Sequence, residues 1–170
     1  RERFLSAPAN PKVLFLMRSY NRPKYLEETL ASVAQSDMTK YCSRRLIYDD
    51  ASTDSRVRRI LEGYEDTYQV LFHQENKRQQ SMVALLDYVR TQLDPASYDY
   101  ICYLDNDATV KKDWLQTCLR TYREIQEEQG ISNDQFILTG FNTSNHPIVK
   151  QHPNYVQKQS IGGIHMFFHR

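Results

Sequence analysis

The chain has 170 residues, of which 40% are hydrophobic, enough for one domain with a single core. Its 22 lysines and arginines nearly balance its 21 aspartates and glutamates, and without a basic block we expect no nucleic-acid partner. No apolar run approaches membrane-spanning length, and the scattered Cys42, Cys102 and Cys118 favour reduced thiols over a disulfide framework.

The spacing of apolar residues predicts strands that alternate with helices. Strands are predicted where short runs are rich in strand formers, at residues 12–17, 44–48, 69–73, 99–104 and 136–139. Helices are predicted where apolar residues recur at helical spacing, at residues 24–35, 55–64, 79–92 and 113–129. The polar segment 146–159 holds two prolines and predicts an irregular loop, whereas the apolar run 164–168 predicts a further strand.

Strand–helix units in succession predict an α/β fold with a mostly parallel sheet covered by helices on both faces. Ligands of such sheets bind outside the carboxyl ends of the strands. Polar and charged segments follow four of the predicted strands, at residues 18–22, 49–54, 76–78 and 105–107. We therefore expect these four segments to converge on one binding site.

Asp105 and Asp107 directly follow the apolar run 100–104. Because alternate residues of an extended backbone face the same side, both carboxylates can point into one crevice. Carboxylate oxygens in that arrangement suit Mg²⁺ or Mn²⁺ and the phosphates that such a cation carries. The alternative is a turn that is merely rich in aspartate and asparagine.

A second acidic segment, Asp49–Asp54, ends the second predicted strand. Ser52, Thr53 and Asp54 could simply cap the next helix, since such side chains accept hydrogen bonds from free backbone N–H groups. Asp49 and Asp50 are adjacent acids that repel each other unless something pairs with them. A carboxylate there can accept the ring N–H of a uracil or thymine, which would give it a role in reading a base.

Taken together, these segments resemble the family 2 glycosyltransferases of the GT-A fold, which is Rossmann-like. The order and separation of four motifs carry the resemblance, at residues 13–23, 49–54, 103–107 and 162–168. It spans roughly residues 11 to 170. The resemblance implies a metal-dependent, inverting transfer of a sugar from a nucleotide-diphosphate donor, with UDP expected, to a hydroxyl of a glycan or another acceptor.

The resemblance also implies roles for individual residues. Tyr20 matches the position that packs against the base, and Asp50 matches the residue that hydrogen-bonds the base edge. Asp105 and Asp107 match the metal motif, with Asp107 the more direct ligand and Asp105 acting on the ribose or through water.

Four cations at the predicted strand ends could pair with a diphosphate, since arginine matches phosphate oxygens in a fork: Arg18, Arg22, Lys77 and Arg78. Ordinary surface charge is the alternative for each, and we nominate Arg18 and Arg78 as donor contacts. Many family members carry a glycine where this chain has Arg78. A bulky cation at that position would fill part of the donor pocket or contact phosphate.

Three further features near these motifs have structural interpretations that we favour. His165 could supply a third metal ligand, but a strand histidine satisfied by its neighbours is the preferred interpretation. Trp114 is expected to pack beneath the metal loop, and Cys102 and Cys118 to be buried and inert.

The family's catalytic base is a carboxylate that follows the small-residue segment 162–168. We nominate no catalytic residue in this chain and expect the base to lie beyond Arg170, its last residue. The chain also starts at Arg1 without methionine. We expect residues 1–170 to be a single GT-A domain truncated at both ends, with the acceptor-side part largely missing.

Two other functions stay open. The domain could be a non-catalytic nucleotide-sugar-binding scaffold, or a sugar nucleotidyltransferase, although the latter normally carries a glycine-rich loop that residues 17–21 lack. Composition favours the cytoplasm, with peripheral membrane contact or a secretory-pathway lumen as alternatives.

Overall fold

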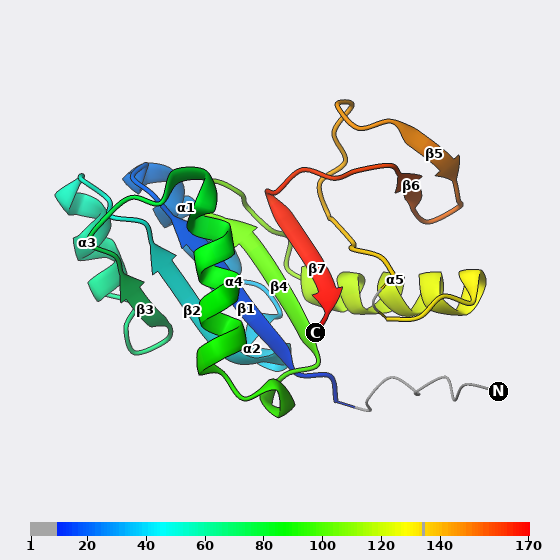
Figure 1. Ribbon diagram of the computed structural model, residues 1–170, viewed down its shortest axis with the longest axis horizontal. Coiled ribbons are helices and arrows are strands. Elements are labelled where there is room, and N and C mark those ends of the chain that lie inside the picture. The colour runs from blue at the N-terminus through cyan, green and yellow to red at the C-terminus, as the bar shows by residue number, and fades with distance from the viewer. Residues whose placement is uncertain (1–9, 134) are drawn as a thin grey trace.

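A computed structural model describes residues 10–133 and 135–170 of the chain (Figure 1). Its main sheet has five strands in the order β3-β2-β1-β4-β7. Their bounds are β1 Val13–Ser19, β2 Cys42–Asp49, β3 Gln69–Phe72, β4 Tyr100–Asp105 and β7 His165–His169. β1 to β4 are parallel, and β7 pairs antiparallel with β4, which confirms the mostly parallel sheet.

Helices follow the strands as expected, with one short addition. Their bounds are α1 Pro23–Ala34, α2 Met38–Tyr41, α3 Ser55–Glu62, α4 Ser81–Gln92 and α5 Trp114–Gln129, and two 3₁₀ turns lie at Arg78–Gln80 and Pro95–Ser97. Pro23 occupies the first turn of α1, and Gly130 ends α5 in the left-handed conformation. No helix in the described part of the chain is long and apolar enough to cross a membrane.

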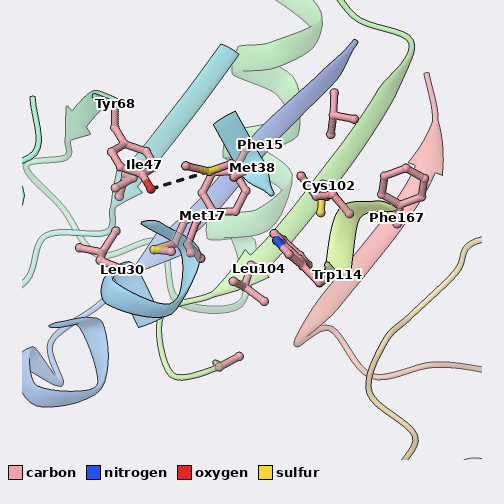
Figure 2. Close-up of a cluster of buried hydrophobic side chains, with 14 of the residues drawn as sticks. Phe15, Met17, Leu30, Met38, Ile47, Tyr68, Cys102, Leu104, Trp114 and Phe167 are labelled. Atoms are coloured by element: carbon pink, nitrogen blue, oxygen red, sulfur yellow. Dashed lines mark hydrogen bonds between the residues drawn. The ribbon is translucent and has the colours of Figure 1, made fainter. Parts of the chain in front are cut away.

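Side chains of β1 alternate between the two faces of the sheet and divide the core between them. Phe15 and Met17 point to the face covered by α1, α2, α3 and α5, where Trp114 and Phe167 also pack (Figure 2). Leu14 and Leu16 point to the other face, which α4 covers. Burial of each such side chain contributes about 1.5–3 kcal/mol to the free energy of folding, so packing on both faces of the sheet stabilises β1.

Two element predictions were wrong. Residues 136–139 form no strand but a single bridge, in which Leu138 exchanges both backbone hydrogen bonds with Phe167 at 2.9 and 2.8 Å. The pairing stops there because the next N–H, that of Gly140, donates instead to the ring of His165.

The predicted loop 146–159 contains a hairpin, β5 Ile148–Gln151 and β6 Val156–Lys158. Its prolines lie before β5 and in the turn, so both strands keep their N–H donors. Every residue of β5 is exposed, so the sequence carries no alternation of apolar and polar residues that would signal it. Figure 1 shows the hairpin projecting away from the main sheet.

Candidate functional site

A pocket of about 540 Å³ opens at the carboxyl ends of β1, β2 and β4. All six residues that the sequence nominated line it, namely Arg18, Tyr20, Asp50, Arg78, Asp105 and Asp107. The other lining residues are Arg22, Asn76, Gln79, Ser81 and Asn106. The four segments expected to converge therefore do meet at one edge of the sheet.

Asn21 holds three of these segments together. Its backbone N–H donates to Ser52 Oγ at 2.8 Å, and its carbonyl oxygen accepts from Asn106 Nδ2 at 3.1 Å. Its side-chain oxygen accepts from the N–H groups of Thr53 and Asp54 at 2.9 and 3.1 Å. Sequence reasoning missed this residue. Its one local signal is its type, because asparagine tolerates the positive φ of 52° found here.

The adjacent acids Asp49 and Asp50 do not face each other. Asp49 is buried and accepts hydrogen bonds from the backbone N–H and the hydroxyl of Ser52 at 3.0 and 2.6 Å. Asp50 accepts from the N–H groups of Lys77 and Arg78 at 2.7 and 3.2 Å. Asp49 therefore shapes its own loop, whereas Asp50 joins that loop to the segment after β3.

The alternative that Ser52, Thr53 and Asp54 cap the next helix holds only for Asp54. Asp54 caps α3 by accepting from the N–H of Arg56 at 2.9 Å. Its pKa is lowered to about 2, chiefly by its hydrogen bonds with Arg56. Ser52 and Thr53 do not cap the helix but take part in the contacts of Asp49 and Asn21.

The carboxylates of the metal motif each meet an arginine. Asp105 accepts from Arg18 at 3.3 Å and from the hydroxyl of Tyr103, and Asp107 pairs with Arg22. Burial raises the pKa of Asp105, while the hydrogen bond from Tyr103 and the charge of Arg18 oppose that shift. Burial, and then the negative charge of Asp105, raises the pKa of Tyr103. Tyr103 is thus a neutral donor that orients Asp105.

The cations of the pocket are held differently. Arg18 contacts Ser81 Oγ at 3.3 Å as well as Asp105. Arg78 has a φ of 52°, and its guanidinium finds no hydrogen-bond or ion-pair partner among residues 10–133 and 135–170. The ammonium of Lys77 lies 3.7 Å from Glu75, and Lys77 does not line the pocket.

His165 is a core residue, as preferred above, and the alternative of a metal ligand is wrong. The ring is 1% exposed, its Nδ1 accepts from the N–H of Gly140 at 2.9 Å, and its Nε2 lies 3.5 Å from Cys102 Sγ. Burial lowers the pKa of His165 to about 4, so the ring is neutral at neutral pH. Both nitrogens are occupied by protein groups outside the pocket.

Trp114 is a core residue, and among the described residues its ring and hydrogen-bond contacts are with residues outside the metal loop 105–107. Its ring lies edge-on to Phe15 and tilted against His165, and its Nε1–H donates to Ser36 Oγ at 3.0 Å. Cys102 and Cys118 are buried free thiols, and burial raises the pKa of Cys118 to about 12. Neither thiol is available as a nucleophile.

Arg170, beyond which the catalytic base is expected, lies away from the pocket. Its N–H donates to the carbonyl oxygen of Asp99 at 3.2 Å, and its guanidinium donates to the carbonyl oxygen of Pro95. Both contacts are at the amino end of β4, whereas the pocket opens at the carboxyl end of that strand. The base beyond Arg170 stays a prediction, and no catalytic residue is assigned within the chain.

The donor set of the pocket fits a hard divalent cation. Asp105 and Asp107 offer carboxylate oxygens, and Mg²⁺ takes only one or two such ligands before water and phosphate complete its shell. The described residues contain no group of three or more histidines, cysteines, aspartates or glutamates arranged to hold a metal. The residues therefore suit a metal that arrives with phosphate oxygens of its own.

Comparisons with known proteins agree with this geometry. Residues 15–167 match the model of the family described as glycosyl transferase family 2. The succinoglycan biosynthesis protein ExoM of Rhizobium meliloti (strain 1021) is 30% identical over 107 residues, which cover 62% of this chain and 33% of ExoM. The putative teichuronic acid biosynthesis glycosyltransferase TuaG of Bacillus subtilis (strain 168) is 32% identical over 117 residues, which cover 67% of this chain and 43% of TuaG. The chain thus spans less than half the length of either relative.

Solved structures of Staphylococcus aureus TarS share the fold. TarS 1–349 in complex with UDP matches 82% of this chain and 40% of its own, with a TM-score of 0.55 and 20% identity. The complex of TarS 1–349 with UDP-GlcNAc matches 82% of this chain and 38% of its own, with a TM-score of 0.52 and 21% identity. The fold class predicted from the sequence is therefore confirmed, and the chain belongs to glycosyl transferase family 2, with the GT-A fold.

Proposed function

We propose that this chain is the donor-binding region of a metal-dependent, inverting glycosyltransferase that uses a UDP-sugar. The sugar would pass to a hydroxyl of a glycan or another acceptor, in the cytoplasm. The observation that carries the proposal is one pocket in which an exposed tyrosine, three carboxylates and three arginines meet. The UDP and UDP-GlcNAc complexes of TarS, which shares this fold, support the choice of nucleotide.

The base would lie between Tyr20 and Asp50. Tyr20 is 42% exposed, so its ring can cover a base without any rearrangement of the core. The carboxylate of Asp50 is fixed by two backbone N–H groups and keeps lone pairs for the ring N–H of uracil. A carboxylate oriented in this way reads a base edge with little loss of side-chain entropy.

The diphosphate would lie among Arg18, Arg22 and Arg78. Breaking the bond between sugar and phosphate leaves growing negative charge on the departing nucleotide. Guanidinium groups already lining the pocket stabilise that charge where it develops. When bound, Mn²⁺ or Mg²⁺ would add Lewis-acid stabilisation, with Asp107 as its direct ligand and Asp105 acting through water or the ribose.

Turnover of the donor tests this function. We expect slow, Mn²⁺-dependent hydrolysis of UDP-N-acetylglucosamine or UDP-glucose, in which water takes the sugar in place of an acceptor and UDP leaves, with a loss of at least about tenfold in Asp107→Asn. Asp87→Asn is the matched control, because Asp87 pairs with Arg90 on α4 outside the pocket. Absence of any release above the uncatalysed rate would favour a scaffold. Formation of UTP and sugar 1-phosphate from the UDP-sugar and pyrophosphate would indicate a nucleotidyltransferase.

A further inference from the structure

Arg22 combines a fixed backbone with an exposed side chain. Its φ of 57° places it in the left-handed region directly after Asn21, whose contacts tie the backbone to the loops after β2 and β4. Pro23 follows in the first turn of α1. The side chain of Arg22, by contrast, is 61% exposed and its guanidinium rests on the carboxylate of Asp107. The origin of the side chain is therefore fixed while its end can move.

This ion pair occupies the carboxylate on which the proposed metal site depends. A divalent cation at Asp107 must displace the guanidinium or sit beside a like charge, and both reduce its affinity. A bound diphosphate removes the conflict, because its oxygens can accept the fork of Arg22 and bind the cation at the same time. Both partners of the exchange line the same pocket.

Arg18 is not placed to do the same. Its side chain is 32% exposed, contacts both Ser81 and Asp105, and Asp105 is held in turn by the buried Tyr103. Among the described side chains, Arg22 alone is hydrogen-bonded to the carboxylate of Asp107. Of the two ion pairs, the one between Arg22 and Asp107 is the more easily opened.

We propose that Arg22 is a partner-exchange residue, which occupies Asp107 in the free protein and moves to the donor's diphosphate when metal and nucleotide bind. The proposal rests on the function proposed above. The exchange of Arg22 makes metal and nucleotide bind cooperatively, and by linkage each ligand raises the protein's affinity for the other by the same factor. The free protein then binds a lone cation weakly at its donor site.

The variant Arg22→Gln tests the exchange through two affinities that change in opposite directions. Mn²⁺ binding without nucleotide, followed by the electron paramagnetic resonance signal of the free ion, tightens about twofold to fivefold, the range for breaking an exposed ion pair. UDP binding at saturating Mn²⁺, followed by calorimetry, weakens about tenfold or more, because a charged hydrogen-bond donor is lost.

Arg56→Gln is the matched control, since Arg56 pairs with Asp54 at 2.7 Å outside the pocket. It leaves both affinities unchanged. In Asp107→Asn, adding Arg22→Gln produces no gain in Mn²⁺ affinity. If Arg22 had a purely structural role, Arg22→Gln would weaken the binding of both Mn²⁺ and UDP. Unchanged or weaker Mn²⁺ binding in Arg22→Gln therefore overturns the exchange. In that case, UDP binding by the wild type still leaves the proposed function standing. Absence of UDP binding by the folded wild type overturns both.

Discussion

At the scale of single residues, the loops around the pocket hold strained backbone. Among the described residues, the non-glycine residues with positive φ are Asn21, Arg22, Ala51 and Arg78, and all four lie in loops that form the pocket edge. Arg22, Ala51 and Arg78 each cost about 1–2 kcal/mol relative to a glycine in the same conformation, whereas asparagine tolerates it. Such strain persists where surrounding contacts impose it, and it concentrates at ligand sites.

Replacing Arg78 by glycine should separate strain from binding. Glycine relieves the φ of 52° but gives the unfolded chain more freedom, so we expect the free energy of unfolding to rise by about 0.5–1 kcal/mol. UDP affinity should fall about tenfold at the same time, because the guanidinium open to the diphosphate is gone. Urea unfolding and calorimetry measure the two changes, and a variant that binds UDP as well as the wild type would remove Arg78 from the donor site.

Replacing Asn21 by alanine should loosen the pocket from its centre. The variant loses the acceptor of two backbone N–H groups and puts a poorly tolerated residue at positive φ, so we expect a loss of about 2–3 kcal/mol in urea unfolding. Asn21→Gly keeps the backbone conformation and should lose less. Equal losses in the two variants would show that the positive φ contributes nothing beyond the lost side-chain contacts.

At the scale of elements, β7 completes the sheet beside β4 and carries a buried histidine into the core. The register pairs His165 with Leu104, one residue before Asp105, which places His165 beside the end of the strand that bears the metal motif. The ring touches Cys102, Trp114 and Phe141, all outside the pocket. The role of His165 is therefore structural.

Acid should destabilise the fold through this histidine. Its folded pKa of about 4 lies below the ordinary value of 6.5, so the unfolded chain binds the proton first and stability falls as pH drops from 6.5 to 4. The full effect is about 3 kcal/mol. Urea unfolding at several pH values should show a shallower pH dependence in His165→Gln than in the wild type. His146→Gln, a change outside the core, is the control, and identical slopes in wild type and His165→Gln would contradict the assignment.

The success of the element predictions depended on whether the signal was local. β1 and β4 are apolar runs buried on both faces, and α4 and α5 have apolar stripes, so their patterns follow from burial. Residues 136–139 have the local composition of a strand, but only Leu138 pairs with a neighbouring strand, at Phe167. Whether a partner strand continues alongside is not encoded in the local composition. The exposed hairpin β5–β6 buries too little to leave a pattern.

The same reasoning explains what was found of the site. The acids and arginines could be predicted because each lies in the last residues of a strand or in the loop that follows it, at the ligand edge of the sheet. The contacts of Asn21 join residues 31 and 85 positions apart, and the partner of Arg22 is also 85 positions away. No window of sequence contains both members of such a pair.

At the scale of the whole molecule, one edge of a parallel sheet gathers every nominated donor residue, while the helices and β7 keep the strands in place. Each carboxylate of the pocket has a partner within the protein: Asp105 and Asp107 pair with arginines, and Asp50 accepts hydrogen bonds from backbone N–H groups. In the proposed exchange, Arg22 leaves Asp107 for the diphosphate when a metal and a nucleotide bind together.

Titration calorimetry of UDP, with GDP for comparison, tests the central claim most directly when it is run with and without Mn²⁺ on wild type, Asp107→Asn and the control Asp87→Asn. We predict UDP binding that requires Mn²⁺, exceeds GDP binding by about tenfold, is lost in Asp107→Asn and is kept in Asp87→Asn. Folded protein that binds neither nucleotide, or binds UDP equally well in Asp107→Asn, would contradict the assignment of this pocket as the donor site.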